Sequence, residues 1–185
     1  ADLLPAAEDV QRVLALEHLE HKVRDDVAER QLDVAAHDVR VADGPALADA
    51  DGVALLELDA AIALRARHYT RRILLLEGFF AEGELPEIAA RRLAIVVHHV
   101  EQIRMLEAAR LPRPLEVYLK INTGMNRLGL PPSEVAAAVE RLTQCDAVAT
   151  MRLMSHLARG EEPDGVREQV AAFDAACQGL PYPRS

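Results

Sequence analysis

From about residue 47 onward, hydrophobic and polar positions follow a repeating order. A short aliphatic run comes first, then a polar loop, then residues with helical spacing. The runs are rich in leucine and β-branched residues and are only four or five residues long, as expected for parallel strands that are buried on both faces. They predict strands over residues 53–56, 73–76, 93–97, 117–121 and 150–154.

The segments between the later runs have the spacing of amphipathic helices. Three apolar stripes are expected to face the sheet. They consist of Val100, Ile103 and Leu106; of Val135, Val139 and Leu142; and of Val166, Val170, Phe173 and Cys177. Ser133 follows a Pro-Pro pair and is predicted to cap the second helix. Gly179 is predicted to end the third.

About five βα units in succession predict an α/β protein with a parallel sheet and right-handed crossovers. A closed (β/α)8 barrel needs eight such units and about 250 residues, so five units indicate a partial TIM-type barrel. An open doubly wound sheet is the structural alternative. The sequence has no G-x-G-x-x-G or Walker loop that would support a nucleotide site of that kind.

Residues 1–46 differ in composition from residues 47–185 and are interpreted as an atypical leader, in contrast to the barrel-like remainder. Val10, Leu14, Val23 and Val27 would fit a polar helix, and Val39 and Val41 a brief strand. His18 and His21, with Glu17 or Glu20, have a spacing that would allow metal binding. A solvated helix face is the favoured interpretation, because polar and charged residues are mostly exposed. No metal site is therefore predicted.

Charge and composition narrow the possible partners. The net charge of -9 argues against non-specific nucleic-acid binding and against attachment to anionic lipid. No apolar run approaches the roughly 18 residues that span a bilayer, and the acidic start does not resemble a signal peptide. Cys145 and Cys177 form no C-x-x-C pair and are expected to be small buried hydrophobes. We therefore expect a cytoplasmic protein.

Residues 120–130, KINTGMNRLGL, are the candidate site, because they leave a strand through a polar loop flanked by two cations. α/β barrels place their chemistry at this end of the strands. Strand alternation sets Lys120 on the face opposite Leu119, toward the barrel interior. Lys120 and Arg127 repel each other there unless an anion lies between them or one loses its charge. The alternative is that Lys120 extends out of the strand end into solvent.

KINTGMNRLGL resembles the Lys-x-Asp/Asn-Thr-Gly-Met-x-Arg-Leu-Gly signature of bacterial alanine racemases, which are pyridoxal-phosphate barrel enzymes. Further segments follow in that family's order: LADADGVALLELDAAIALRA, ILLLEGFF, LMSHLAR and the final LPYPRS. The resemblance covers about residues 47–185. It implies an isomerase that interconverts L-alanine and D-alanine for cell-wall precursors, and the family forms homodimers.

The resemblance also implies roles for individual residues. Arg127 matches the arginine that binds the cofactor's phenolic oxygen and meets the substrate carboxylate. Lys120 matches a lysine that is carbamylated in many members, which would convert it into an anion that holds Arg127. His156 matches the histidine beside the pyridine ring. Met125 either lines the pocket or packs the loop, and Asn122 stands where aspartate is commoner.

The family's cofactor-binding (aldimine) lysine has no counterpart here. Lys22 and Lys120 are the lysines of the sequence, and the surroundings of Lys22 do not match the family's Lys-Ala-Asn-Ala-Tyr-Gly segment. The phosphate-binding loop and C-terminal domain are not found either. We therefore expect an internal piece of an alanine racemase behind a foreign, frameshifted leader, inactive by itself. The alternatives are a non-catalytic pyridoxal-phosphate barrel of the homeostasis type and a non-functional truncated product.

Overall fold

The computed structural model describes residues 50–158 and 166–185. The chain divides into two compact units, Ala1–Leu76 and Glu77–Ser185. The helix, the strand and the histidine pair predicted between Val10 and Val41 lie outside the described residues, as does the predicted boundary after residue 46.

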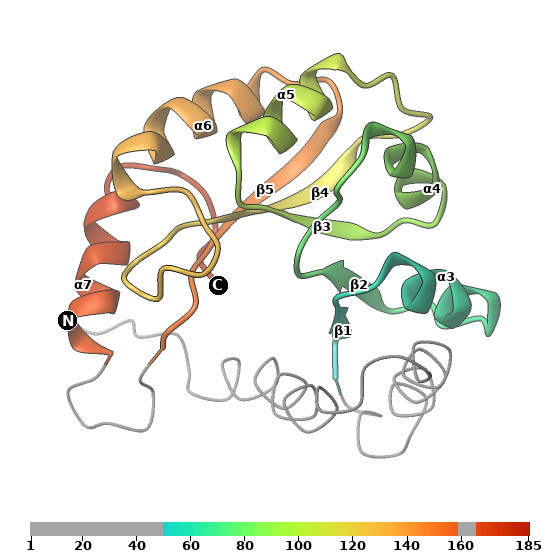
Figure 1. Cartoon of the computed structure of the whole chain (residues 1–185), viewed down its shortest axis with the longest axis horizontal. Helices are drawn as coiled ribbons and strands as arrows, with labels where there is room; N and C mark the ends of the chain where they lie inside the picture. The colour runs from blue at the N-terminus through green and yellow to red at the C-terminus, as the bar shows by residue number, and fades with distance from the viewer. Residues whose placement is uncertain (1–49, 159–165) are drawn as a thin grey trace. The chain divides into compact units, whose positions relative to one another are not determined.

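The described part of the first unit is one βαβ turn (Figure 1). Strand β1 (Gly52–Leu55) pairs in parallel with β2 (Arg72–Leu75), and helix α3 (Leu58–Ala66) connects them. The last three residues of each strand are buried, in keeping with their aliphatic sequences GVAL and RILL. Both predicted strands of this unit are confirmed, each beginning one residue earlier than expected.

The second unit continues the alternation of helices and strands. Its helical elements are η2 (Glu82–Glu84), α4 (Leu85–Ala90), α5 (Val100–Ala108), η3 (Pro132–Glu134), α6 (Val135–Thr143) and α7 (Arg167–Ala176). Its strands are β3 (Ala94–Val97), β4 (Leu115–Lys120) and β5 (Val148–Met154). β3 pairs with β4 and β4 with β5, in parallel. The three predicted strands are confirmed, with β4 and β5 starting two residues earlier.

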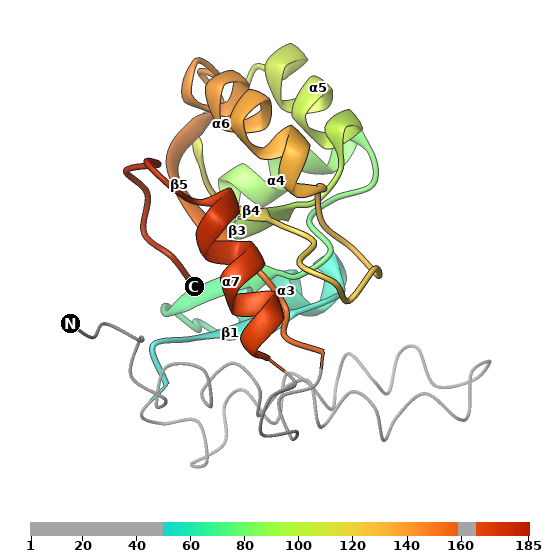
Figure 2. The same ribbon diagram turned by 90° about the vertical axis from the view of Figure 1, so that its left-hand side faces the viewer.

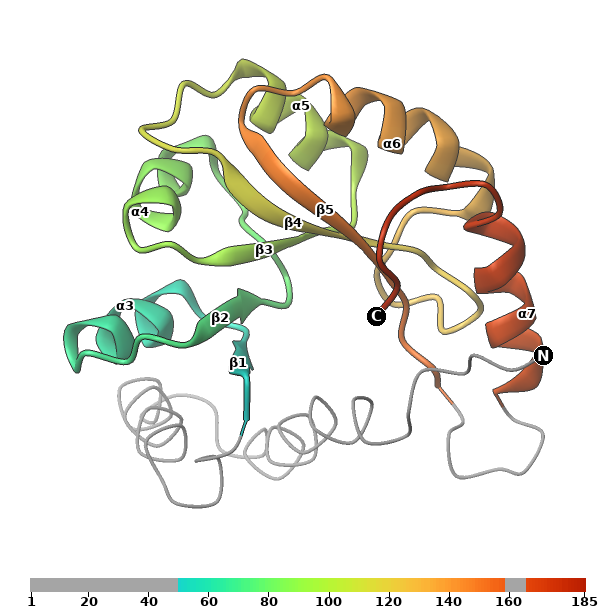
Figure 3. The ribbon, with the colours of Figure 1, turned by 180° about the vertical axis from the view of Figure 1, so that it is seen from behind.

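The helices of this unit pack against one side of its strands. Figures 1 and 3 show α5 and α6 side by side over β3, β4 and β5, and Figure 2 shows the same pair from the side. Ile103 and Leu106 of α5 and Val139 and Leu142 of α6 are buried, which confirms two of the predicted stripes as core. Burying such side chains contributes about 1.5–3 kcal/mol each.

The predicted third stripe is only partly correct. Cys177 is fully buried, but Val166, Val170 and Phe173 are half-buried. The buried residue within α7 is instead a polar one, Gln169. The reason is that α7 lies against the backbone of the segment after β5, and the Gln169 amide binds the polar groups of that backbone.

The predicted helix ends give one error and one success. Ser133 does not cap α6: it lies inside η3, and the position before α6 is Glu134, which makes no side-chain capping bond. The Pro-Pro pair starts the extra 3-10 turn and displaces the helix start beyond the serine. Gly179 follows the end of α7 with a φ of 76°, in the left-handed region that favours glycine.

Residues 183–185 lie beside β5. Leu153 N donates to Pro183 O, and Ser185 N donates to Leu153 O, both at 2.8 Å, so that Leu153 and Arg184 form a parallel bridge. This is the position of a following parallel strand, as the resemblance of LPYPRS to the approach of such a strand implies. Both cysteines are free and buried, as expected, and burial raises the pKa of each thiol.

Candidate functional site

Four buried polar side chains occur among residues 50–158 and 166–185: Gln102, Lys120, Thr123 and Gln169. Lys120 ends strand β4, and each of the other three lies in, or hydrogen-bonds to, a segment that follows a parallel strand. Buried polar groups need partners, so such a gathering marks an organised region rather than ordinary core. The region is the carboxyl edge of β3, β4 and β5, where α/β barrels carry their active sites.

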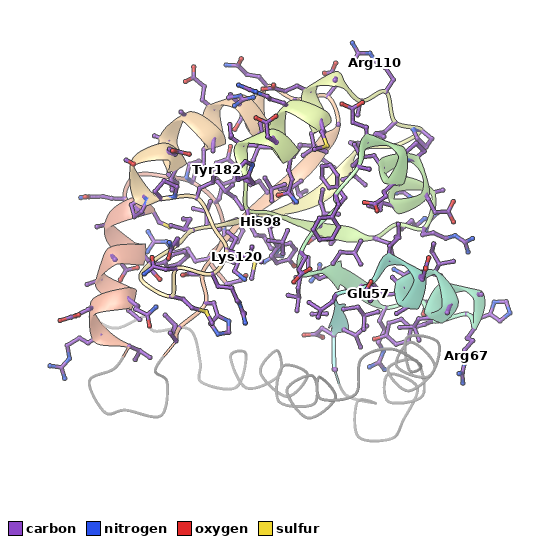
Figure 4. All side chains as sticks on the ribbon, in the orientation of Figure 1. Glu57, Arg67, His98, Arg110, Lys120 and Tyr182 are labelled. Carbon is purple, nitrogen blue, oxygen red and sulfur yellow. The ribbon has the colours of Figure 1, made fainter. Side chains whose placement is uncertain are left out.

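Lys120 is the last residue of β4 and only 5% exposed. This burial rules out the alternative in which the side chain extends into solvent. The parallel register pairs Val97 with Leu119, so the next positions on the two strands are His98 and Lys120. Figure 4 shows these two side chains close together at the ends of β3 and β4.

The His98 ring is half-buried, and its Nε2 lies 3.1 Å from Glu77 O. A carbonyl only accepts, so Nε2 carries the proton and Nδ1 is the acceptor of the neutral ring. Burial lowers the pKa of His98, and the charges of Lys120 and His99 lower it further, against the opposing effect of the Glu77 carbonyl. Burial and a neighbouring cation both favour the neutral ring.

Gln102 of α5 holds the backbone of His98 and His99 through hydrogen bonds. Its Oε1 accepts from His98 N at 2.8 Å and from His99 N at 3.3 Å. Its Nε2 donates to Phe79 O at 3.1 Å and to Glu77 O at 3.2 Å. One buried amide therefore satisfies four backbone groups from two loops, which holds both loops in a single arrangement.

Residues 122–130, the signature loop, are closed by their own hydrogen bonds. Asn122 Oδ1 accepts from Gly124 N and Asn126 N, both at 3.0 Å, and Asn122 Nδ2 donates to Asn126 Oδ1 at 2.9 Å. Asn126 has a φ of 59°, a conformation that asparagine tolerates. At the base of the loop, Asn122 N donates to Leu130 O at 2.8 Å and Leu130 N to Lys120 O at 2.9 Å.

Gly129 completes the closure of the loop. Its φ is 122°, and a Cβ at this position would lie 2.7 Å from Asn122 N and 2.9 Å from the carbonyl carbon of Ile121. Glycine is therefore required by conformation and by space. Gly129, Asn122 and Asn126 therefore each have a structural role in closing the loop that follows β4.

Arg127 is exposed on the signature loop, whereas Lys120 is buried at its base. Within the described ranges, the Arg127 guanidinium forms no ion pair with a carboxylate. An exposed guanidinium on a rigid loop can bind an anionic oxygen with two parallel hydrogen bonds. Met125 is half-buried in the same loop, a position compatible with both of its predicted roles.

The signature loop is tied to the segment after β5. Ser155 Oγ donates to Ile121 O at 2.9 Å, and Thr123 Oγ1 lies 2.6 Å from Ser155 Oγ. A serine hydroxyl has one proton, so Thr123 must be the donor in the second bond. His156 follows directly and is half-buried. The structure thus sets the three predicted site residues, Lys120, Arg127 and His156, on two adjacent segments.

Three contributors were missed from the sequence: His98, Gln102 and Gln169. Only Gln102 carried a local signal, because His99 and Gln102 form a capping box at the start of α5, with histidine in the usual place of serine. Within the described part of the chain, no three His, Cys, Asp or Glu residues gather as a metal site would need. None of the described helices is long and apolar enough to cross a membrane.

Comparison with known proteins assigns this architecture to a family. The sequence model of "Alanine racemase, N-terminal domain" matches residues 33–184. The chain belongs to this alanine racemase family. The match begins upstream of residue 47, and it accounts for the signature loop as well as for the alternation of strands and helices.

Curated alanine racemases are similar over most of this chain. The enzyme of Nitrosospira multiformis is 51% identical over 143 residues, covering 76% of this chain and 40% of the relative. That of Azoarcus sp. is 48% identical over 140 residues, covering 75% and 40%. The chain thus spans about 40% of the length of the curated relatives it matches. These relatives are enzymes, named as alanine racemases.

Solved structures of alanine racemases are similar to this chain in fold as well. The biosynthetic alanine racemase of Pseudomonas aeruginosa superimposes with a TM-score of 0.69 at 37% identity, over 76% of this chain and 40% of that one. The alanine racemase of Oenococcus oeni gives 0.66 at 25% identity. With parallel strands that alternate with helices, this likeness confirms the partial TIM-type barrel over the doubly wound alternative.

Proposed function

We propose that this polypeptide carries part of the active site of a pyridoxal-phosphate-dependent alanine racemase. The observation that supports this most is the pairing of a buried lysine with a self-closed loop. Lys120 lies 5% exposed at the base of the signature loop, Arg127 is presented on the loop, and His156 follows the adjacent strand. This arrangement suits an anionic, planar ligand at the carboxyl edge of a barrel.

The residues fit the part of the cofactor that carries its ring and phenolic oxygen. A guanidinium at Arg127 matches a phenolate or carboxylate oxygen, and the imidazole of His156 matches the face of a pyridine ring. Pyridoxal phosphate, when bound, supplies the electron sink for the charge left on Cα. The residues of the chain would bind and orient the cofactor. Arg127 would also bind the carboxylate of the substrate.

Lys120, at the base of the signature loop, is proposed to orient the Arg127 guanidinium. Carbamylation of its Nζ would replace a cation with an anion, and an anion attracts and orients a guanidinium. Rigid closure of the loop by Asn122 and Gly129 would then fix the direction in which Arg127 points. Preorganised charges of this kind cost no rearrangement during proton transfer.

Lys22 and Lys120 do not match the lysine that binds the cofactor covalently in this family. We therefore propose that the 185-residue polypeptide does not racemise alanine by itself, and that residues 1–46 are a leader distinct from the barrel part. The whole enzyme would act in the cytoplasm on alanine, as a homodimer, without nucleic acid or membrane as partner. Its product would serve peptidoglycan synthesis.

Two experiments test the proposal. Purified polypeptide with pyridoxal phosphate and L-alanine should form no D-alanine, and D-alanine formation would refute its inactivity. Replacing the matching segment of the Nitrosospira multiformis enzyme with residues 50–185 should give a chimera that racemises alanine. A folded, cofactor-loaded chimera without activity would refute the racemase assignment.

A non-catalytic pyridoxal-phosphate barrel is the second candidate. It is favoured by the same cofactor-facing residues, but it also requires a covalent lysine, which neither Lys22 nor Lys120 matches. Borohydride reduction of the polypeptide with pyridoxal phosphate, followed by peptide mass spectrometry, separates the two. A single stoichiometric adduct on Lys120 would favour the carrier, whereas absence of a site-specific adduct favours the racemase fragment.

A further inference from the structure

Gln169 occupies an unexpected position in α7. It is 6% exposed, while the apolar residues Val166, Val170 and Phe173 of the same helix are half-buried. A glutamine is seldom the most buried residue of an amphipathic helix, because its amide must find partners wherever water is excluded. Its partners therefore indicate why a glutamine is present.

Both ends of the Gln169 amide bind the segment after β5. Oε1 accepts from Ala158 N at 2.9 Å, and Nε2 donates to His156 O at 3.3 Å. The amide thus spans the backbone of three consecutive residues, with one bond in each direction. Such a two-bond contact defines both the position and the orientation of the segment that carries His156.

The stem of the same side chain borders the signature loop. A Cβ placed at Gly124 would lie 3.7 Å from Gln169 Cγ and 3.8 Å from Gln169 Nε2, which are ordinary contact distances. The bond between Thr123 and Ser155 joins the same two segments at a second point. The loop of Arg127 and the segment of His156 are therefore joined directly by hydroxyl groups, and Gln169, which binds the second segment, lies next to Gly124 of the first.

We infer that Gln169 is a positioning residue of the site: it holds His156 and the signature loop in one mutual geometry. The consequence for cofactor binding rests on the proposed function, whereas the positioning itself depends only on the contacts of the chain. A glutamine meets three needs at once, since its amide donates, accepts and has a stem long enough to pass Gly124.

Two variants test whether Gln169 positions the His156 segment through its hydrogen bonds or only fills space in the core. Gln169→Met keeps the length of the side chain and loses both hydrogen bonds. Gln169→Glu keeps an acceptor for Ala158 N but loses the donor to His156 O, where two oxygens then face each other. Gln178→Met is the matched control, because Gln178 is exposed just beyond α7.

The first readout is nuclear magnetic resonance of the 185-residue protein. In Gln169→Met, exchange of the Ala158 amide should accelerate about tenfold, as expected for one lost hydrogen bond, and the His156 ring resonance, assigned with His156→Gln, should broaden or split. In Gln169→Glu the Ala158 amide should stay protected while the His156 signal still broadens. The control should change neither signal. If Gln169→Met does not fold, Gln169→Glu alone decides.

The second readout is binding of 4′-deoxypyridoxine 5′-phosphate, which lacks the aldehyde and so needs no covalent lysine. Its affinity should fall at least threefold in both Gln169 variants and stay constant in the control. An unaltered His156 resonance, or unaltered affinity despite a freed Ala158 amide, would overturn the inference and leave Gln169 a structural residue. Lack of binding to the unmodified protein would instead count against the proposed function, and the His156 resonance would then decide on Gln169.

Discussion

The hydroxyl oxygens of Thr123 and Ser155 lie 2.6 Å apart, although 32 positions separate them in the sequence. Ser155 Oγ donates a hydrogen bond to Ile121 O, at 2.9 Å. The chain of two hydrogen bonds joins the loop after β4 to the segment after β5. These bonds hold the loop that carries Arg127 next to the segment that carries His156.

Removing this connection should destabilise the protein. Ser155→Ala leaves the Thr123 hydroxyl and the Ile121 carbonyl without their partner, at a cost of about 1–3 kcal/mol in the free energy of unfolding. Urea unfolding followed by circular dichroism measures the loss. Ser133→Ala is the matched control: Ser133 is exposed in η3, and its replacement should change stability by less than about 0.5 kcal/mol. Equal effects of the two variants would contradict the role of Ser155.

Gly129 should tolerate no side chain. Gly129→Ala sets a Cβ 2.7 Å from Asn122 N at a φ of 122°, so backbone strain and steric overlap should together lower the free energy of unfolding by about 2–4 kcal/mol. Gly83→Ala is the control, since nothing lies within 4 Å of a Cβ there. Thermal unfolding of the two variants compares them. A Gly129→Ala protein as stable as Gly83→Ala would show that the loop is not closed as described.

His98 should titrate below its ordinary range, with its pKa lowered chiefly by burial and further by Lys120. A lowered pKa in the folded protein means that the unfolded chain binds the proton more readily. The contribution of His98 to stability is therefore complete above about pH 6.5 and is lost as the pH falls through the lowered pKa.

While Lys120 carries its free ammonium group, Lys120→Met removes one of the charges that disfavour the protonated ring, so it should raise the pKa of His98. Proton resonance titration of the His98 ring measures both values, with His98→Asn to assign the signal. Arg104→Met is the charge-matched control, because Arg104 forms an exposed pair with Glu101 on α5. An unchanged His98 titration in Lys120→Met would contradict the electrostatic contact between the two strand ends.

The ion pair between Glu107 of α5 and Arg141 of α6 should contribute little to the free energy of unfolding. The two side chains form a bidentate contact, with both nitrogen–oxygen distances at 2.8 Å, and the pKa of Glu107 is lowered by its hydrogen bonds to Arg141. Both remain about one-third exposed, so solvent screens the attraction. Glu107→Gln should cost no more than about 1 kcal/mol, and less in high salt. A salt-independent loss of several kcal/mol would contradict this.

The sequence predicted what is encoded locally. Aliphatic runs located all five described strands, and the order of glycine, asparagine and charged residues in the signature loop located Lys120 and Arg127. His156 was found by resemblance, because a histidine two residues beyond a strand has no signature of its own.

Contacts between distant segments were not predictable in the same way. Gln169 is one polar residue in a helix pattern, and nothing near it reveals that His156 and Ala158 are its partners. His98 received no role from the sequence, because its importance depends on the strand register that brings it next to Lys120. Ser133 was misjudged because the Pro-Pro pair begins a 3-10 turn instead of the helix itself.

The most direct test of the racemase assignment is D-alanine formation by the chimera that carries residues 50–185 in the Nitrosospira multiformis enzyme. With an intact Arg127 we expect a kcat/KM within about tenfold of the parent enzyme. Arg127→Ala in the chimera should lower it by a further factor of roughly 100–1000, the loss expected when one preorganised charge contact to the reacting groups is removed. A cofactor-loaded chimera that forms no D-alanine, or one that Arg127→Ala leaves unchanged, would contradict the account.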